Sequence, residues 1–273
     1  MIRLNQNEFN QIIEYMRDTY GINLEKKKVL IECRMTKELK RLGVNSFAEY
    51  MNLLRRDKDG KLAGQMVNRL TTNYTYFMRE PVHFEILERT IFRELFSQKA
   101  FGIGNIWCAG CATGEECYTL AMALEEYKAN RGQLADARIL ATDISDEVLQ
   151  MARKGVYSEK ELDALPTGWK QKYCKRVNEN YFAVVESLKS NIRFRNHNLM
   201  TPISNPAKFD LILCRNVMIY FDRDSRRKLV RLLEESLNPG GYLLIGHAEL
   251  LSADETELES VYPAVYRKKK QPA

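Results

Sequence analysis

Apolar residues recur at intervals of three and four along the first 70 positions, a pattern that predicts amphipathic helices. One helix is expected around residues 9–16, and Gly21 follows it as a C-terminal glycine. A second helix runs from about Glu25 to Leu42, with a narrow apolar stripe that should face a core. Ser46 is a suitable N-cap for a third helix. The front of the chain is therefore predicted to be all-α.

From about Phe101 the pattern changes to short apolar runs that alternate with amphipathic stretches. This alternation predicts an α/β fold with a parallel sheet that is covered on both faces. Ligands of such sheets bind beyond the carboxyl ends of the strands, so the site is expected in the turns there. The expected strands lie in 102–110, 137–143, 208–216, 237–249 and 261–268, and the expected helices in 113–127, 145–155 and 222–237.

One stretch interrupts this alternation. Between Trp169 and Met200 the sequence has no glycine and reads as one or two extended segments. We interpret about 169–194 as a small β insertion that leads into the third strand. The chain then divides into a helical N-terminal domain, residues 1–80, and a Rossmann-like α/β domain, residues 81–273.

Composition narrows the class of protein. With 273 residues, 45% hydrophobic and 29% charged, the chain is neither collagen-like nor wholly disordered. No run approaches 18 apolar residues, so no membrane insertion is expected. The N-terminus lacks the apolar core of a signal peptide, and the six cysteines form no dense framework. We therefore expect a cytoplasmic protein. Because the chain has three histidines, we expect no metal.

Positive charge is concentrated at the front of the chain. Residues 1–70 hold 14 Lys and Arg against 9 Asp and Glu, which accounts for five of the six net positive charges. On the second helix, five basic residues fall on one side. This side is either a solvated face or a docking surface for an acidic partner. Its members are Lys26, Arg34, Lys37, Lys40 and Arg41.

The segment AGCATGEE (109–116) predicts a strand, a turn and the start of a helix. It matches neither the dinucleotide-binding glycine pattern nor a P-loop. Thr113 and Glu116 have the spacing of a capping box, which gives Glu116 a structural interpretation. Glu115 has no such explanation, and an acid at this point suits a cationic ligand.

Asp143 ends the second predicted strand, where nucleotide-binding folds place an acid that accepts ribose hydroxyls. The alternative interpretation is an Asp that caps the following helix. An acid on the ribose without a phosphate-binding loop favours a nucleoside that lacks phosphates. S-adenosylmethionine (SAM) has this character.

Further polar candidates follow the other predicted elements. Arg79, in the segment 71–80, could hold a carboxylate with its two-pronged guanidinium, although this segment could also be a polar linker. Asn198 and Asn216 could bind an adenine edge or an amino-acid group. Arg215 is costly to bury without an anion, and Tyr220 is either a polar tip in the pocket or a core residue.

These motifs together resemble the CheR-type chemotaxis methyltransferases, which methylate glutamates of bacterial chemoreceptors. Met78 stands where the family has Phe, and Cys117 where it has Pro; both substitutions leave the polar positions unchanged. The matching segments are TTNYTYFMRE (71–80), CATGEECYT (111–119), FDLILCRNVMIYF (209–221) and GGYLLIGHAE (240–249).

The resemblance implies a class I SAM-dependent methyltransferase domain that releases S-adenosylhomocysteine. It implies docking of the basic helix on the acidic cytoplasmic helical bundle of methyl-accepting chemoreceptors, and we expect a monomer. No nucleic-acid partner is expected, because the sequence shows no aromatic stacking platform. The residues implied to contact SAM are Asn73, Thr75, Arg79, Glu115, Asp143, Asn198, Leu199, Arg215 and Asn216.

Methylation of a glutamate needs no general base, because its carboxyl group, with a pKa of about 4.3, is ionised at neutral pH. The enzyme must align the reacting atoms and exclude water. We expect Arg79 to anchor the carboxylate of SAM, and Tyr220 or Arg215 to orient the acceptor. Two alternatives stay open: a SAM methyltransferase for another substrate, such as RNA, and a non-catalytic SAM-binding signalling module.

Overall fold

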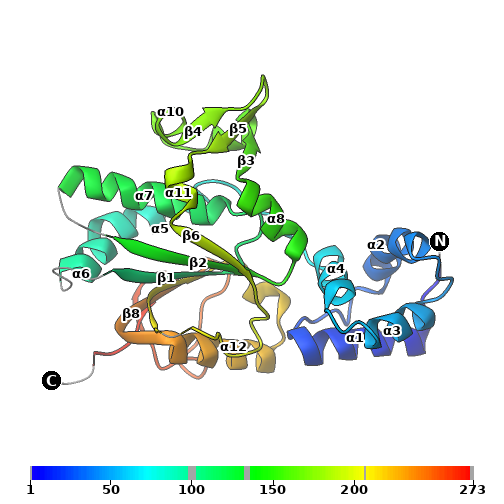
Figure 1. The fold of residues 1–273 in the computed structure, drawn as a ribbon. Coiled ribbons are helices and arrows are strands. Elements are labelled where there is room, and N and C mark those ends of the chain that lie inside the picture. Colours follow the sequence, from blue (N-terminus) through cyan, green and yellow to red (C-terminus); the bar gives the residue numbers. More distant parts are fainter. Residues whose placement is uncertain (1, 98–102, 132–135, 206, 271–273) are drawn as a thin grey trace.

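The computed structural model describes residues 2–97, 103–131, 136–205 and 207–270. A helical domain lies beside a larger α/β body, and a small sheet projects from the body (Figure 1). The helical domain has its own buried core, built from the apolar stripes that the sequence predicts. Its helices are α1 (Gln6–Tyr20), α2 (Lys28–Arg41), α3 (Phe47–Arg55) and α4 (Lys61–Leu70).

Local signals set the ends of these helices as expected. Asn5 and Glu8 form a capping box at the start of α1, and Gly21 ends the helix with a φ of 71°. The Ser46 side chain accepts a hydrogen bond from the backbone of Glu49 at the start of α3.

The body is built on a seven-stranded sheet with the order β6-β2-β1-β7-β8-β10-β9. The first five strands are parallel, and β10 is antiparallel to both of its neighbours. We predicted one strand over 261–268. The structure instead has two antiparallel strands there, β9 and β10, so this prediction is wrong in detail. The strands are β1 (Gly104–Ala109), β2 (Ala137–Asp143), β6 (Ile192–Asn196), β7 (Phe209–Cys214), β8 (Leu237–Ile245), β9 (Glu259–Tyr262) and β10 (Val265–Arg267).

Helices cover both faces of this sheet, as predicted (Figure 1). One face packs against α5, α6 and α7, and the other packs against α12. Ser145 caps α8, and Gly155 ends it in the left-handed conformation. These elements are α5 (Pro81–Ile86), the π-helical turn η1 (Leu87–Ile91), α6 (Phe92–Ser97), α7 (Glu115–Arg131), α8 (Asp146–Lys154), the 3₁₀ turn η2 (Met218–Tyr220) and α12 (Arg223–Ser236).

The small projecting sheet has the order β3-β5-β4. It extends from residue 156 to residue 184, whereas we predicted an insertion over about 169–194. Residues 192–194 belong to β6, an edge strand of the main sheet that the sequence did not reveal as such. Its elements are β3 (Val156–Ser158), α9 (Glu159–Leu162), α10 (Trp169–Tyr173), β4 (Cys174–Arg176) and β5 (Tyr181–Val184), and the short helix α11 (Glu186–Lys189) follows it.

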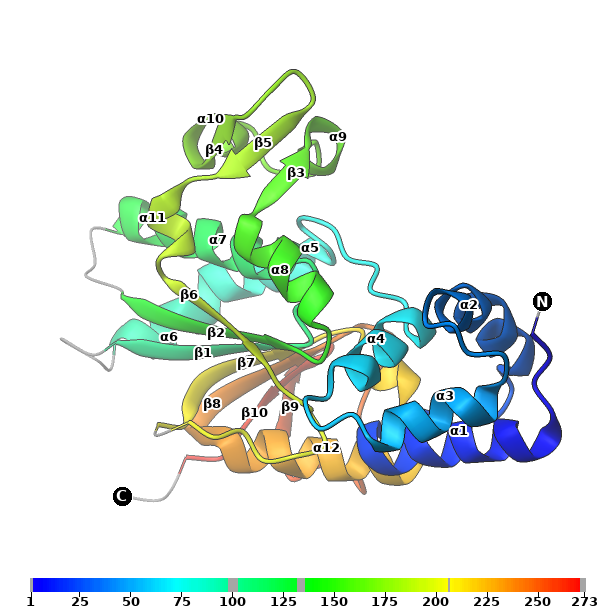
Figure 2. The same cartoon turned by 45° about the vertical axis from the view of Figure 1, so that its right-hand side comes forward.

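The helical domain packs directly against the carboxyl edge of the sheet (Figure 2). Ile22 forms a β-bridge with Phe221, and the amide of Asn23 donates to the carbonyl of Tyr220 at 2.8 Å. Gly21 is required at this contact, because a Cβ atom there would lie 2.7 Å from the Met200 sulfur and the Phe221 ring. Among the described residues, no helix is long and apolar enough to cross a membrane.

Candidate functional site

A cavity of about 110 Å³ opens at this junction. Its walls come from the end of α1, the end of α4, the segment 71–79 and the turns after β1, β2, β6 and β7. The site therefore lies at the carboxyl edge of the sheet, as the α/β pattern predicts. Three lining residues from α1, the turn after it and α4 were not indicated by the sequence: Tyr20, Ile22 and Val67.

The cavity brings together most of the polar residues selected from the sequence. Glu115 is the exception, because its buried carboxylate accepts the Thr113 hydroxyl at 2.7 and 2.9 Å and does not line the cavity. Glu116, for which we expected a capping role, lines the cavity, and the SAM contact expected of Glu115 stays a prediction. The predicted residues that do line it are Asn73, Thr75, Arg79, Asp143, Asn198, Leu199, Arg215, Asn216 and Tyr220.

Asp143 is almost fully buried at the end of β2. Its two carboxylate oxygens accept the backbone N–H groups of Ala112 and Ser145, each at 3.0 Å. Ser145, and not Asp143, is the N-cap of α8. Burial raises the pKa of Asp143 above its usual value, although these backbone hydrogen bonds oppose the shift. The backbone of Ile144 adds a third hydrogen bond, so only part of the acceptor capacity of the carboxylate is left for a ligand.

Arg215 is buried at the end of β7 and compensated by two acids. Its guanidinium contacts Glu116 at 2.8 Å and Glu80 at 3.2 Å, and it also donates to the backbone carbonyl of Arg79. Burial raises the pKa of Glu116, and the nearby Arg215 opposes this rise. The anion that a buried arginine requires is thus supplied by the protein, and Arg215 shapes the cavity wall.

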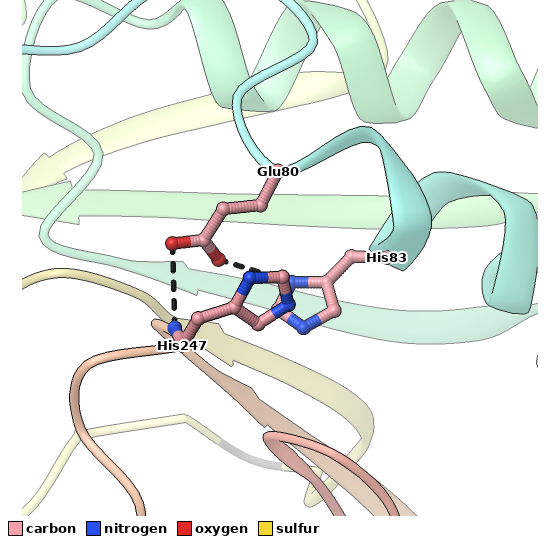
Figure 3. A group of neighbouring side chains, drawn as sticks. All are labelled: Glu80, His83 and His247. Carbon is pink, nitrogen blue, oxygen red and sulfur yellow. Dashed lines mark hydrogen bonds and ion pairs between the residues drawn. The ribbon is translucent and has the colours of Figure 1, made fainter.

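Glu80 joins three segments of the site (Figure 3). Besides Arg215, its carboxylate accepts the side-chain amide of Asn216 and the backbone N–H of His247, both at 3.3 Å. The imidazole of His83 lies 3.4 Å away. Burial alone would raise the pKa of Glu80, but Arg215 and these hydrogen-bond donors outweigh it and lower the pKa.

Glu80, His83 and His247 form the one group in the described part of the chain with metal-ligating atoms within 4.8 Å of one another. A cation there would compete with Arg215 for the Glu80 carboxylate. The observed contacts assign Glu80 a structural role, because it ties α5 to the turns after β7 and β8.

Arg79 and Tyr220 both hydrogen-bond to the backbone of the segment 71–80. One guanidinium nitrogen of Arg79 donates to the carbonyl of Tyr74 at 2.8 Å. Within the described residues, Arg79 has no carboxylate partner, so most of its donors remain for a ligand. The Tyr220 hydroxyl donates to the carbonyl of Thr72 at 2.8 Å.

Asn198 and Asn216 differ in how many of their side-chain polar atoms are already hydrogen-bonded within the protein. Asn198 donates to the carbonyl of Thr19 at 2.8 Å and accepts the amide of Met200, so it links the helical domain to the turn after β6. Asn216 adopts a left-handed φ of 59°, and its side-chain oxygen is buried without a hydrogen-bond partner. Asn216 therefore carries an unpaired acceptor at the cavity wall.

Glu249 is a functional candidate that sequence reasoning quoted in a motif without giving it a role. Its buried carboxylate accepts the backbone N–H groups of Asn216, Gly246 and Ile219, at 2.7, 2.8 and 3.2 Å. It therefore fixes the turn after β7, and with it the conformation of Asn216.

The predicted basic docking side of α2 is smaller than expected. Arg34 is half-buried and donates to the carbonyls of Arg69 and Thr71 at 3.0 and 2.8 Å. Arg41 is exposed and pairs with Glu38 at 2.5 Å. The remaining members of this side, Lys26, Lys37 and Lys40, are exposed.

A Rossmann-like sheet whose carboxyl edge opens into a cavity with acids and no phosphate loop fits the class of SAM-dependent methyltransferases. Comparison with known families agrees. The family described as "CheR methyltransferase, SAM binding domain" matches residues 73–266, and "CheR methyltransferase, all-alpha domain" matches residues 7–71. The chain therefore belongs to the CheR methyltransferase family. These matches meet at residues 71–73, ahead of the domain boundary that we expected at residue 80.

Curated relatives cover nearly the whole chain. The chain is 41% identical to a chemotaxis protein methyltransferase of Borreliella burgdorferi, over 98% of this chain and 96% of that one. It is 32% identical to chemotaxis protein methyltransferase 1 of Pseudomonas aeruginosa, over 96% and 98%. It is 33% identical to the chemotaxis protein methyltransferase of Salmonella typhimurium, over 92% and 86%.

Proposed function

We propose that this chain transfers the methyl group of SAM to glutamate side chains on the cytoplasmic helical bundle of chemoreceptors. The products would be glutamate methyl esters and S-adenosylhomocysteine. The main support is family membership along the whole chain, shared with relatives named for chemotaxis. We further propose a cytoplasmic location, with which the six free cysteines agree.

The cavity residues fit the chemical groups of SAM. Asp143 would accept the ribose hydroxyls with its remaining acceptor capacity, and Arg79 would hold the methionine carboxylate. The unpaired oxygen of Asn216 would accept the amino group. When bound, SAM supplies a methyl group made electrophilic by a sulfonium. Glu116 lines the same cavity and adds negative charge that suits this cation.

The residues of the chain have little acid–base chemistry to perform, since the acceptor glutamate is already ionised. They must hold donor and acceptor in line and exclude water. We assign Tyr220 to the acceptor: its hydroxyl would turn from the Thr72 carbonyl to the incoming carboxylate. Arg215 acts as a positioning residue, because Glu80 and Glu116 occupy its guanidinium.

Transfer of labelled methyl from SAM to an isolated receptor cytoplasmic domain tests the proposal. The label should appear in the receptor domain as an ester that is released by alkali. Label in RNA would support the alternative substrate. SAM binding without turnover on any receptor domain would support the non-catalytic module.

Docking on the acidic receptor bundle is tested by charge reversal on α2. The double variant Lys37→Glu, Lys40→Glu should reduce receptor methylation, and the loss should shrink at high salt, because long-range attraction is screened. Lys208→Glu, Lys269→Glu is the matched control, since both lysines are exposed and lie outside α2. An equal loss in the control, or a loss independent of salt, would refute docking through α2.

A further inference from the structure

Two tyrosines at the mouth of the cavity remain without a role in the proposed function. Tyr74 and Tyr76 lie on the segment 71–80 and have 68% and 41% of their surface exposed. Their rings are in contact, with centroids 5.7 Å apart, and Tyr74 lines the cavity. Isolated exposed apolar side chains are common, but a contacting aromatic pair beside a cofactor cavity is a more specific feature. We call this pair the aromatic lip.

The lip is held in a defined position. Arg79 donates to the carbonyl of Tyr74, so a hydrogen bond holds the backbone between the two rings. The Arg79 guanidinium also lies over the Tyr76 ring, 5.7 Å from its centroid. The exposed rings are therefore presented in an ordered arrangement, which lowers the entropy cost of binding a partner.

The chemistry of the lip indicates what it contacts. Tyrosine provides a large apolar surface with a polar end, and it is enriched among the residues that contribute most to protein interfaces. Arg79 is assigned to the methionine carboxylate of SAM, so the two rings and their hydroxyls provide the contact with the partner. An acidic surface alone would leave the two rings unused. The matching surface carries a carboxylate flanked by apolar side chains.

We propose that the aromatic lip binds the receptor segment that carries the acceptor glutamate, by packing on apolar side chains next to that residue. This inference rests on the proposed function. It separates two contacts with the receptor: α2 attracts the acidic bundle over a long range, and the lip holds the local segment at the cavity. The first depends on salt, and the second does so only weakly.

Tyr76 provides the sharpest test because it does not line the cavity. Tyr76→Ser should raise KM for the receptor domain about tenfold, the effect of losing one well-buried interface side chain, with kcat nearly unchanged. Tyr76→Phe should restore the KM of the wild type, since the ring provides the contact. The loss should persist at high salt. Tyr262→Ser on β9 is the matched control, because Tyr262 is 39% exposed.

A purely structural role for Tyr76 gives a different result. If Tyr76 serves only to support Arg79, Tyr76→Ser should weaken SAM binding in calorimetry and leave KM for the receptor unchanged, which would refute the inference. Equal KM values for Tyr76→Ser and Tyr262→Ser would refute it as well. Failure of the wild-type protein to methylate any receptor domain would refute the proposed function instead, so the two failures are distinguishable.

Discussion

Replacing Asp143 by Asn tests the centre of the proposed SAM site without changing the size of the side chain. Asp143 accepts one backbone N–H on each oxygen, from Ala112 and from Ser145. Asn has a single acceptor oxygen, so its amide group must face one of these two donors. Ala112 also has a left-handed φ of 46°, a costly conformation for a residue with a Cβ atom, and the hydrogen bond to Asp143 helps to hold it.

The expected magnitudes follow from this geometry. One buried N–H left without an acceptor costs about 1–3 kcal/mol of stability. For a chain of this size, that corresponds to a lowering of Tm by roughly 2–12 °C. The ribose would also lose a hydrogen bond to a charged acceptor, worth about 1.5–3 kcal/mol. The Kd for SAM should therefore rise about 10- to 150-fold.

The pH dependence supplies a second signature. Burial raises the pKa of Asp143, so its contribution to folding is full below the pKa of the unfolded chain and is lost as pH rises through the folded pKa. Binding of ribose hydroxyls favours the ionised carboxylate. Affinity of the wild-type protein should therefore fall as pH decreases through this raised pKa, and Asp143→Asn should show no such fall.

Calorimetric titration with SAM at several pH values, combined with thermal unfolding, measures both effects. A Kd for Asp143→Asn within threefold of wild type, in a variant that is folded at the assay temperature, would show that Asp143 does not bind the ribose. A parallel pH profile for both proteins would lead to the same conclusion.

Two further substitutions test how the site is held together. Glu249→Gln should destabilise the protein by about 1–3 kcal/mol and weaken SAM binding, because one of three backbone N–H groups around Asn216 loses its acceptor; urea unfolding that matches wild type would contradict this. Gly114→Ala should destabilise the fold by about 1–3 kcal/mol in the same measurement, since φ is 98° and the new Cβ would lie 2.9 Å from that of Ala152. A stable Gly114→Ala variant would mean that α8 can move away.

Local sequence rules predicted the elements well where a single residue decides the backbone. Gly21, Ser46 and Ser145 act at helix ends as their chemistry requires. The limits of the projecting sheet were missed because short strands such as Val156–Ser158 carry too few residues to show a period. The hairpin formed by β9 and β10 was missed for the same reason.

Most residues of the site could be predicted from the sequence, but the contacts between them could not. Sequence spacing could not decide which of Glu115 and Glu116 faces the cavity, because neighbouring residues on the first helical turn differ only in direction. The orientation of the Glu116 side chain is set by its ion pair with Arg215, which lies 99 positions away in the sequence. Similarly, Arg34 looked available on a basic helix face, but it is bound to carbonyls at the end of α4. Such pairings arise from the folded packing alone.

The wall that the helical domain contributes to the cavity has a thermodynamic consequence. Tyr20, Ile22 and Val67 would lose part of their contact with a bound ligand if this domain separated from the sheet. Occupancy of the cavity should therefore strengthen the attachment of the two domains. By reciprocity, any molecule that binds the helical domain and shifts its attachment must change the cavity's affinity by the same factor. The region that we propose to meet the receptor and the region that we propose to hold the methyl donor would, in this sense, be energetically one unit.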